Sequence, residues 1–397
     1  MICSATFVSC SKDKDSPLHK DRSHRVVLVY MAAENTLGVG HTYDQGDLTE
    51  MCAGAADIPA GDRLVIYHDG RSNPVLYELD NKTQARSLDD LKPVKAWKEE
   101  MDSATPETLD DVLTFLYHNY PADTYGLVFW SHGCGWLTYD GTPETASRRR
   151  PKEWFGVDNN NNIISDNGSR MNMDDMARVL EKYRDIEYIL FDACFMQTIE
   201  VAYELRNTTS YIIGSPAEIP GQGAPYKSML PTLFSQTDAA HDIAFAYYDH
   251  YYSRDESGVA LSVIETARLE EFADVMSDIF SRYDVKDTYT SGLLNYFNFD
   301  RFGDAYHMPD FYDIKGLMQR MLTEEDYAVW LAAFNRLVPV SYACDSWFTQ
   351  YYGRDLPINK QQYGGVSMYL PFEKYSSEAF YNDFANTAWA KRTDIRW

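Results

Sequence analysis

Five short runs of apolar residues, rich in β-branched side chains, constrain the fold of this chain more than any other feature of its sequence. They cover residues 25–31, 63–68, 125–130, 187–191 and 211–213. A short run that is apolar throughout is typical of a strand buried on both faces, because a strand with one face in water alternates apolar and polar residues. Other elements of the chain must therefore cover both faces of the predicted sheet.

Helical patterns lie between these runs. Residues 105–116 begin with threonine, proline and glutamate, which suit an N-cap and a first helical turn, and continue with apolar residues at helical spacing. A second helix is predicted at residues 173–183, and a third is predicted to begin near Cys194 and run through Leu205. Strands alternating with helices of this length indicate a mostly parallel sheet that is covered on both faces.

The pattern changes beyond about residue 235. Helix-like stretches dominate at residues 238–253 and 266–283, with strand-like pieces near residues 258–264 and 365–370. We therefore predict a smaller C-terminal α+β subdomain, residues 236–397, after a first domain of residues 25–235. Aromatic residues crowd this second half, either as the core of the subdomain or as a glycan-binding face.

The acidic composition limits the partners of this protein. Asp and Glu number 60 against 36 Lys and Arg, which gives a formal net charge of -24. Nucleic acid is excluded as a partner, because a phosphate backbone requires a basic face. Cationic ligands, such as basic peptides or Ca²⁺, remain compatible with this charge. The six cysteines form no CxxC pair and do not cluster with histidine, so neither a zinc site nor a disulfide framework is predicted.

The first 24 residues differ from the rest of the sequence. An apolar segment ends at Cys10 and is followed at once by charged residues, which resembles the tail of a bacterial lipoprotein signal. Cys10 would then carry the lipid, and residues 11–24 would form a tether. The alternative is a disordered N-terminus that is apolar by chance. We expect an exported protein in the outer membrane, the periplasm or the medium, with membrane contact only through this anchor.

Two of the predicted strands end in side chains that suit nucleophilic catalysis. One strand runs into His132 and Gly133, and another runs into Asp192 and Cys194. Functional groups collect at the carboxyl ends of parallel strands. A thiol at a helix N-terminus favours the thiolate, and a neighbouring histidine can accept its proton. The backbone N–H groups of Gly133 and Cys194 would then face a developing oxyanion.

Each of these two residues also has a structural reading. A lone cysteine at a strand end is often a small buried hydrophobe, and a lone histidine is often packed or solvated. The two together, at the ends of two strands and with glycine after the histidine, favour the catalytic reading.

The strand ends resemble those of the clostripain family of cysteine peptidases, within the clan of caspases, gingipains and legumains. The matching segments are residues 30–35 (Tyr-Met-Ala-Ala-Glu-Asn), 131–136 (Ser-His-Gly-Cys-Gly-Trp) and 192–194 (Asp-Ala-Cys). The resemblance in order and spacing covers residues 25–235 and is greatest to members from gut Bacteroidetes. It implies a caspase-like three-layer α/β/α sandwich, with His132 as general base and Cys194 as nucleophile. Cys134 stands where the family more often has serine.

The resemblance also implies cleavage of proteins and peptides after Arg or Lys. The carboxylate that binds the substrate's cation would be Asp192, two residues before the nucleophile, with Glu218 as a second candidate. The alternative for Asp192 is a cap on the helix predicted to begin at Cys194.

Family members are zymogens that cut themselves between the histidine and the cysteine. The loop at residues 139–167 holds a basic cluster at residues 148–152, in which Pro151 disfavours cleavage after Arg150. Arg148 or Arg149, and then Lys152, are therefore the expected cut sites, and the product would be two non-covalently associated chains. The alternative is an exposed charged loop without processing.

The chemistry that the resemblance implies requires no cofactor. The resemblance does imply Ca²⁺ for activation. Asp158 and the asparagines after it offer oxygen ligands, but they lack the pattern of an EF-hand loop, so no metal site is assigned from the sequence.

Two further functions remain open. One is a clan member with a different pocket preference, which would cut Asp or Asn peptides instead. The other is a non-catalytic surface lipoprotein that binds glycan or protein, which turnover of an Arg peptide would exclude.

Overall fold

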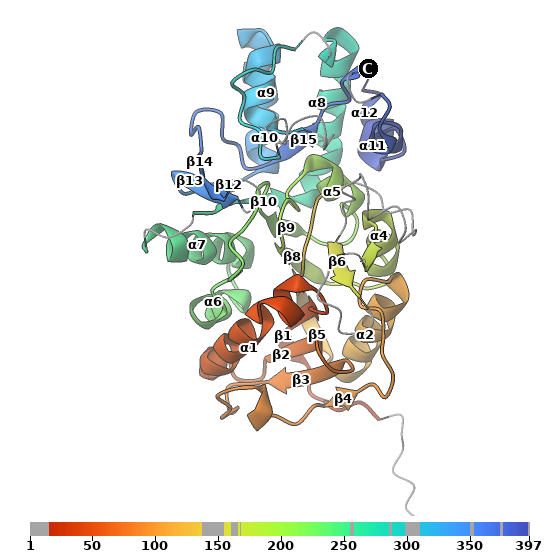
Figure 1. The fold of residues 1–397 in the computed structure, drawn as a ribbon, viewed down its shortest axis with the longest axis vertical. Helices are drawn as coiled ribbons and strands as arrows, with labels where there is room; N and C mark the ends of the chain where they lie inside the picture. The colour runs from red at the N-terminus through yellow and green to blue at the C-terminus, as the bar shows by residue number, and fades with distance from the viewer. Residues whose placement is uncertain are drawn as a thin grey trace, which may run out of the picture.

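A nine-stranded sheet forms the centre of the computed structural model (Figure 1), in the order β12-β10-β9-β8-β5-β1-β2-β3-β4. The structure describes residues 16–136, 155–159, 166, 168–254, 258–285, 288–297, 310–349, 353–373 and 376–395. The strands of this sheet are β1 (Ser23–Ala32), β2 (Arg63–Asp69), β3 (Val75–Leu79), β4 (Lys95–Ala96), β5 (Ala122–Trp130), β8 (Ile186–Asp192), β9 (Tyr211–Gly214), β10 (Ala260–Glu265) and β12 (Val340–Ala343).

The five apolar runs of the sequence are the five parallel strands in the middle of this sheet. Strands β2, β1, β5, β8 and β9 pair in parallel, and the strands outside them pair antiparallel. Every residue of β1 from Val26 to Ala32 is fully buried. Their side chains divide between two hydrophobic clusters, one on each face. The predicted burial on both faces is therefore confirmed.

Helices cover both faces of the sheet, as Figure 1 shows. One face packs against α1 (Tyr43–Gly54), α6 (Tyr226–Leu233) and α7 (Ala239–Tyr252). The other packs against α2 (Pro106–Asn119), α4 (Met173–Leu180) and α5 (Ile199–Glu204). Thr105 caps α2 through its side chain, and proline occupies its first turn, as the sequence predicts. This arrangement is the predicted three-layer α/β/α sandwich.

The C-terminal part of the chain adds helices and small sheets at one end of the sandwich. The helices are α8 (Leu269–Arg282), α9 (Ile314–Met321), α10 (Glu324–Leu337), α11 (Ala379–Phe384) and α12 (Ala388–Thr393). Two-stranded sheets join β11 (Phe311–Asp313) with β15 (Ser367–Tyr369), and β13 (Ser346–Thr349) with β14 (Arg354–Pro357). Strands β10 and β12 also come from this part of the chain, so the central sheet continues past residue 236.

Much of the aromatic content of this part is core. Trp330, Trp347 and Trp389 are each no more than 2% exposed, and Phe272 contacts both Trp330 and Trp389. Among the described residues, no helix is both long and apolar enough to cross a membrane. Cys10 lies outside the described residues, so the structure does not test the predicted lipid anchor. Part of the predicted tether packs on the sandwich, because His19 N donates to the Asn119 carbonyl at 3.2 Å and β1 already begins at Ser23.

Close packing between β5 and β8 generates a stability prediction. A Cβ atom at Gly126 would lie 2.3 Å from the phenol of Tyr188, whose hydroxyl donates to the Leu233 carbonyl at 2.8 Å. Gly126→Ala should therefore lower the free energy of unfolding by about 1–3 kcal/mol, the usual cost of overpacking. Equilibrium denaturation in urea measures this change.

Gly46, in α1, is the matched control. Nothing lies within 4 Å of its Cβ position, so Gly46→Ala should stabilise the protein by about 0.5–1 kcal/mol through backbone entropy. Equal effects of the two substitutions would contradict the predicted packing.

Candidate active site

The parallel pairing of β5 with β8 brings His132 and Cys194 to one edge of the sheet. The register pairs Trp130 with Asp192, so His132 and Cys194 each lie two residues beyond the last pair. Gly133 packs directly on the cysteine's loop, because a Cβ atom there would lie 2.9 Å from Ala193 Cβ and 2.9 Å from the Cys194 carbonyl oxygen. The glycine after the histidine is thus required for close approach, as the sequence suggested.

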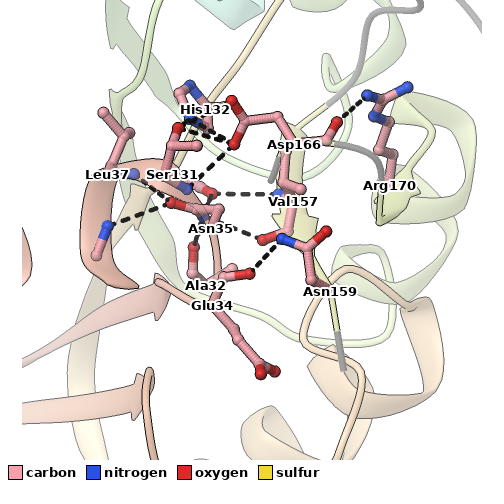
Figure 2. Close-up of polar contacts among 12 residues, drawn as sticks. Ala32, Glu34, Asn35, Leu37, Ser131, His132, Val157, Asn159, Asp166 and Arg170 are labelled. Carbon is pink, nitrogen blue, oxygen red and sulfur yellow. Dashed lines mark hydrogen bonds and ion pairs between the residues drawn. The ribbon is translucent and has the colours of Figure 1, made fainter. Parts of the chain in front are cut away.

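Strand β6 (Phe155–Asp158), which pairs with β7 (Ser169–Met171), fixes the backbone around the histidine. Gly156 N donates to the His132 carbonyl at 3.0 Å, and Val157 N donates to Ser131 Oγ at 3.2 Å. Figure 2 shows Asn35 at the centre of this network, where its Nδ2 reaches Ser131 Oγ and the Val157 carbonyl. Asn35 belongs to a segment singled out in the sequence, and the structure gives it this positioning role.

The imidazole of His132 is held by two side chains (Figure 2). Its Nε2 lies 3.0 Å from Thr36 Oγ1 and 3.2 Å from Asp166 Oδ1. The Thr36 hydroxyl also donates to Asp166 at 2.8 Å. Burial would raise the pKa of Asp166, but the hydrogen bond and charge of His132 and the bonds from Thr36 outweigh it and lower that pKa to about 2. Asp166 is therefore ionised at neutral pH.

No local pattern in the sequence points to Asp166. It lies within the segment 139–167, beyond the run of asparagines, and only the fold brings it to the histidine. Arg170 holds it in place by donating from Nη2 to the Asp166 carbonyl (Figure 2).

Cys194 does not lie at a helix N-terminus, and this part of the prediction is wrong. Helix α5 begins five residues later, at Ile199, with Thr198 as its N-cap. The chain instead makes a turn in which Phe195 adopts a left-handed φ of 60°. Without a helix dipole at the thiol, the physical argument for an intrinsically stabilised thiolate does not hold.

The Cys194 thiol is half-buried, and its surroundings favour the protonated form at neutral pH. Burial and the charge of Glu218 raise its pKa to about 12, although Ile219 N donates to Sγ at 3.4 Å. Glu218, the second of the two predicted pocket acids, therefore lies close enough to the thiol to act on it electrostatically.

Asp192, the other predicted pocket acid, is 3% exposed and fully engaged. Its carboxylate accepts hydrogen bonds from Ala224 N at 3.0 Å, Tyr226 Oη at 2.9 Å and Tyr247 Oη at 3.0 Å. Burial raises its pKa to about 6 against the effect of these donors. The alternative reading as a helix cap is wrong, because Thr198 caps α5.

The structure brings together His132, Gly133, Asp192, Cys194 and Glu218. The remaining predicted site residues, Arg148, Arg149 and Lys152, lie outside the described residues. The backbone N–H groups of Gly133 and Cys194 donate no hydrogen bond to a described residue, so both are available for the predicted oxyanion role. Cys134, the second thiol, follows Gly133 in the sequence and is half-buried.

A histidine and a cysteine at neighbouring strand ends of an α/β/α sandwich define the class of cysteine peptidases with a caspase-like fold. The chain belongs to the clostripain family, whose sequence profile matches residues 29–397. Both the family and the fold class predicted from the sequence are thereby confirmed.

Several relatives support this assignment. Clostripain of Hathewaya histolytica is 26% identical over an alignment of 212 residues, which covers 48% of this chain and only 38% of that relative's length. A secreted C11 cysteine protease from Bacteroides thetaiotaomicron, solved with an irreversible peptide inhibitor, is 30% identical with a TM-score of 0.77 over 94% of this chain and 99% of that one. An inactive zymogen C11 protease from Parabacteroides distasonis is 28% identical with a TM-score of 0.75 over the same shares.

The state of the thiol predicts how the uncut chain reacts with iodoacetamide. With a Cys194 pKa of about 12, the thiolate fraction rises roughly tenfold per pH unit between pH 7 and 9, whereas an ordinary thiol levels off near pH 8.5. Mass mapping of Cys194 alkylation in a Cys134→Ser chain, with the basic residues 148–150 and 152 changed to Gln, measures this rate.

Asp166→Asn in that chain should raise the rate, because it removes the charged one of the two groups that hold His132 Nε2 and so makes this nitrogen more available to take the thiol proton. A rate that levels off below pH 8 without this substitution would mean that the thiolate is already formed in the uncut protein.

Proposed function

We propose that the protein is an exported endopeptidase that hydrolyses peptide bonds after Arg or Lys, with Cys194 as nucleophile and His132 as general base. The observation that carries this proposal is the packing of Gly133 on Ala193 and Cys194, because it sets the two loops against each other. The alternative of a non-catalytic surface lipoprotein would have no need for this arrangement.

The proposed reaction follows from these groups. His132 takes the thiol proton, and Cys194 Sγ attacks the carbonyl carbon of the substrate. The N–H groups of Gly133 and Cys194 stabilise the oxyanion, His132 protonates the leaving amine, and water then hydrolyses the thioester. These steps need no cofactor.

We further propose that the chain is a zymogen in the form described here. His132 Nε2 is engaged by Thr36 and Asp166, and the thiol is protonated, so the pair is not yet assembled for attack. Asp166 lies after the basic cluster in the loop 139–167, so a cut after Arg148, Arg149 or Lys152 would place Asp166 and His132 on different chains. The similarity to an inactive zymogen of 28% identity supports this reading.

The substrate side chain needs an acid next to the thiol. Glu218 acts on the thiol through its charge, whereas Asp192 is saturated by two tyrosine hydroxyls and a backbone N–H. We propose that both acids contribute to the pocket and that Asp192 exchanges one of these donors for the substrate's cation. The net charge of -24 would also attract basic substrates.

Export is proposed from the N-terminal segment, with attachment to the membrane through a lipid on Cys10 or release into the periplasm or medium. A Bacteroides thetaiotaomicron relative of 30% identity is a secreted protease. The partners are then basic protein and peptide substrates and the protein's own second chain.

Self-cleavage tests the nucleophile and the loop together. On incubation, the purified chain should split after Arg148, Arg149 or Lys152, and Cys194→Ala should remain whole, because the attacking thiol is lost. Intact mass spectrometry measures both. If the wild type and Cys194→Ala both stay whole and no Arg peptide is hydrolysed, the result favours a non-catalytic binding protein. If both split alike, an outside protease made the cut.

The two acids can be separated by substrate choice. Asp192→Asn and Glu218→Gln should each lower kcat/KM for an Arg peptide by about 10–100-fold, through the loss of a charge-assisted contact, with a smaller effect on a matched Gln peptide. Steady-state kinetics of processed enzyme gives the ratio. An equal loss on both peptides would assign the residue to structure, and a preference for Asp or Asn peptides would favour a different pocket.

A further inference from the structure

Three carboxylates converge at the end of β1 and β2, apart from the catalytic pair. Glu34 follows β1, Asp69 ends β2, and Glu100 lies in the segment before α2. One carboxylate oxygen from each lies within 4.8 Å of the others, with Glu34 and Asp69 buried and Glu100 exposed. Figure 2 shows the Glu34 side chain pointing away from His132, so the cluster is separate from the catalytic groups.

Asp69 is the most constrained member of this cluster. It is fully buried; its Oδ2 accepts a hydrogen bond from Ser103 Oγ, whereas Oδ1 has no hydrogen-bond partner among the described residues. A buried carboxylate oxygen without a donor is costly unless a cation or a proton compensates it.

Asp158 brings a fourth carboxylate to the same place. Ser103 N donates to Asp158 Oδ2 at 2.5 Å while its hydroxyl donates to Asp69, so one serine orients both acids. Ser103 is held in turn by Tyr30, whose hydroxyl donates to its carbonyl at 2.8 Å, and by Tyr67 at 2.8 Å. Such outer contacts are typical of groups that keep metal ligands in position.

No cation from the described residues balances this charge at Asp69 or Glu100. The ion pairs of the described part of the chain include neither residue, and the charges that act on both are those of other acids. The cluster therefore combines all-oxygen donors, negative charge and a buried oxygen without a hydrogen-bond donor.

We propose that Glu34, Asp69 and Glu100, with Asp158 beside them, bind a Ca²⁺ ion. Carboxylate oxygens are the ligands that this hard cation prefers, and two oxygens on opposite sides of it lie about 4.8 Å apart, against about 4.2 Å for Mg²⁺. All three oxygens lie within 4.8 Å of one another, so one ion of this size can contact them together. The site fits the Ca²⁺ that the family resemblance implies, and it assigns that ion to particular residues.

The position of Asp158 gives the ion a second role. Asp158 follows the basic cluster of the loop 139–167, whereas the other three acids precede it. One ion would therefore link the segments on both sides of the loop, through β6, which also fixes the backbone of His132.

Calcium binding can be tested without turnover, in the full chain carrying Cys194→Ala. Isothermal titration with CaCl₂ should give saturable binding at one site, and CaCl₂ should raise Tm. MgCl₂ should bind more weakly. Glu100→Gln, at the exposed end of the cluster, should lower the Ca²⁺ affinity by more than about tenfold, and its neighbour Glu99→Gln, also exposed, should leave it unchanged.

A second readout uses Tb³⁺ in place of Ca²⁺. Tyr30 and Tyr67 stack with ring centroids 4.6 Å apart beside the site, so excitation of tyrosine should sensitise Tb³⁺ luminescence that Ca²⁺ displaces. Asp69→Asn should abolish the luminescence and raise the Tm of the metal-free chain, because it removes repulsion.

The proposal is overturned if the chain shows no saturable Ca²⁺ binding. A proton shared between Asp69 and Asp158 would then compensate the buried carboxylate oxygen of Asp69. It is also overturned if Mg²⁺ binds as tightly, or if Glu100→Gln and Glu99→Gln bind Ca²⁺ alike, which would place the ion elsewhere. None of these outcomes depends on whether the chain is a peptidase, because the tested chain lacks the nucleophile.

Discussion

The parallel pairing of β5 with β8 is the constraint on which the site depends. Because both strands end at the same edge and Trp130 is in register with Asp192, the residues that follow them must share one small volume. Gly133 leaves no room for a side chain against Ala193 and Cys194. The packing of Gly133 on Ala193 and Cys194 therefore positions the histidine and cysteine loops, and a hydrogen bond between the two side chains is not needed for this.

The environment of each carboxylate near this edge determines what it can do. Asp166, half-exposed and bonded to His132 and Thr36, keeps its charge. Asp192, buried among hydroxyl donors, has a raised pKa, and Asp47, buried nearby and bonded to Trp130 Nε1 at 2.7 Å, has its pKa raised by burial and by the charge of Asp192. This chain has many acidic residues, so residue type alone does not show what a given aspartate does. Its place in the fold decides whether it pairs with a cation or only accepts hydrogen bonds from neighbouring groups.

The sequence predicted the sheet well because each central strand is buried on both faces, which leaves an unmistakable apolar run. It also predicted that His132 and Cys194 would meet, since both follow such runs. The helix at Cys194 was wrong because the apolar residues after it fill a turn, and Thr198, a good N-cap, marks the true start of α5. Asp166 could not be predicted, because its contact with His132 depends on the path of a loop between two distant segments.

The acids at the ends of β1 and β2 are an intermediate case. Glu34 and Asp69 follow apolar runs at the same edge of the sheet, so the reasoning that paired His132 with Cys194 would have paired them as well. The contribution of Glu100 and Asp158, from two further segments, required the fold.

The order of the strands has a consequence for how such a protein can be made. Strands β1 to β5 precede the loop 139–167 and β8 to β12 follow it, yet β5 and β8 are neighbours in the middle of one sheet. A chain divided in this loop before folding would give two halves that each expose a buried strand edge, a surface that invites aggregation. A chain that folds as one piece keeps both edges paired, which favours a cut in the loop only after folding.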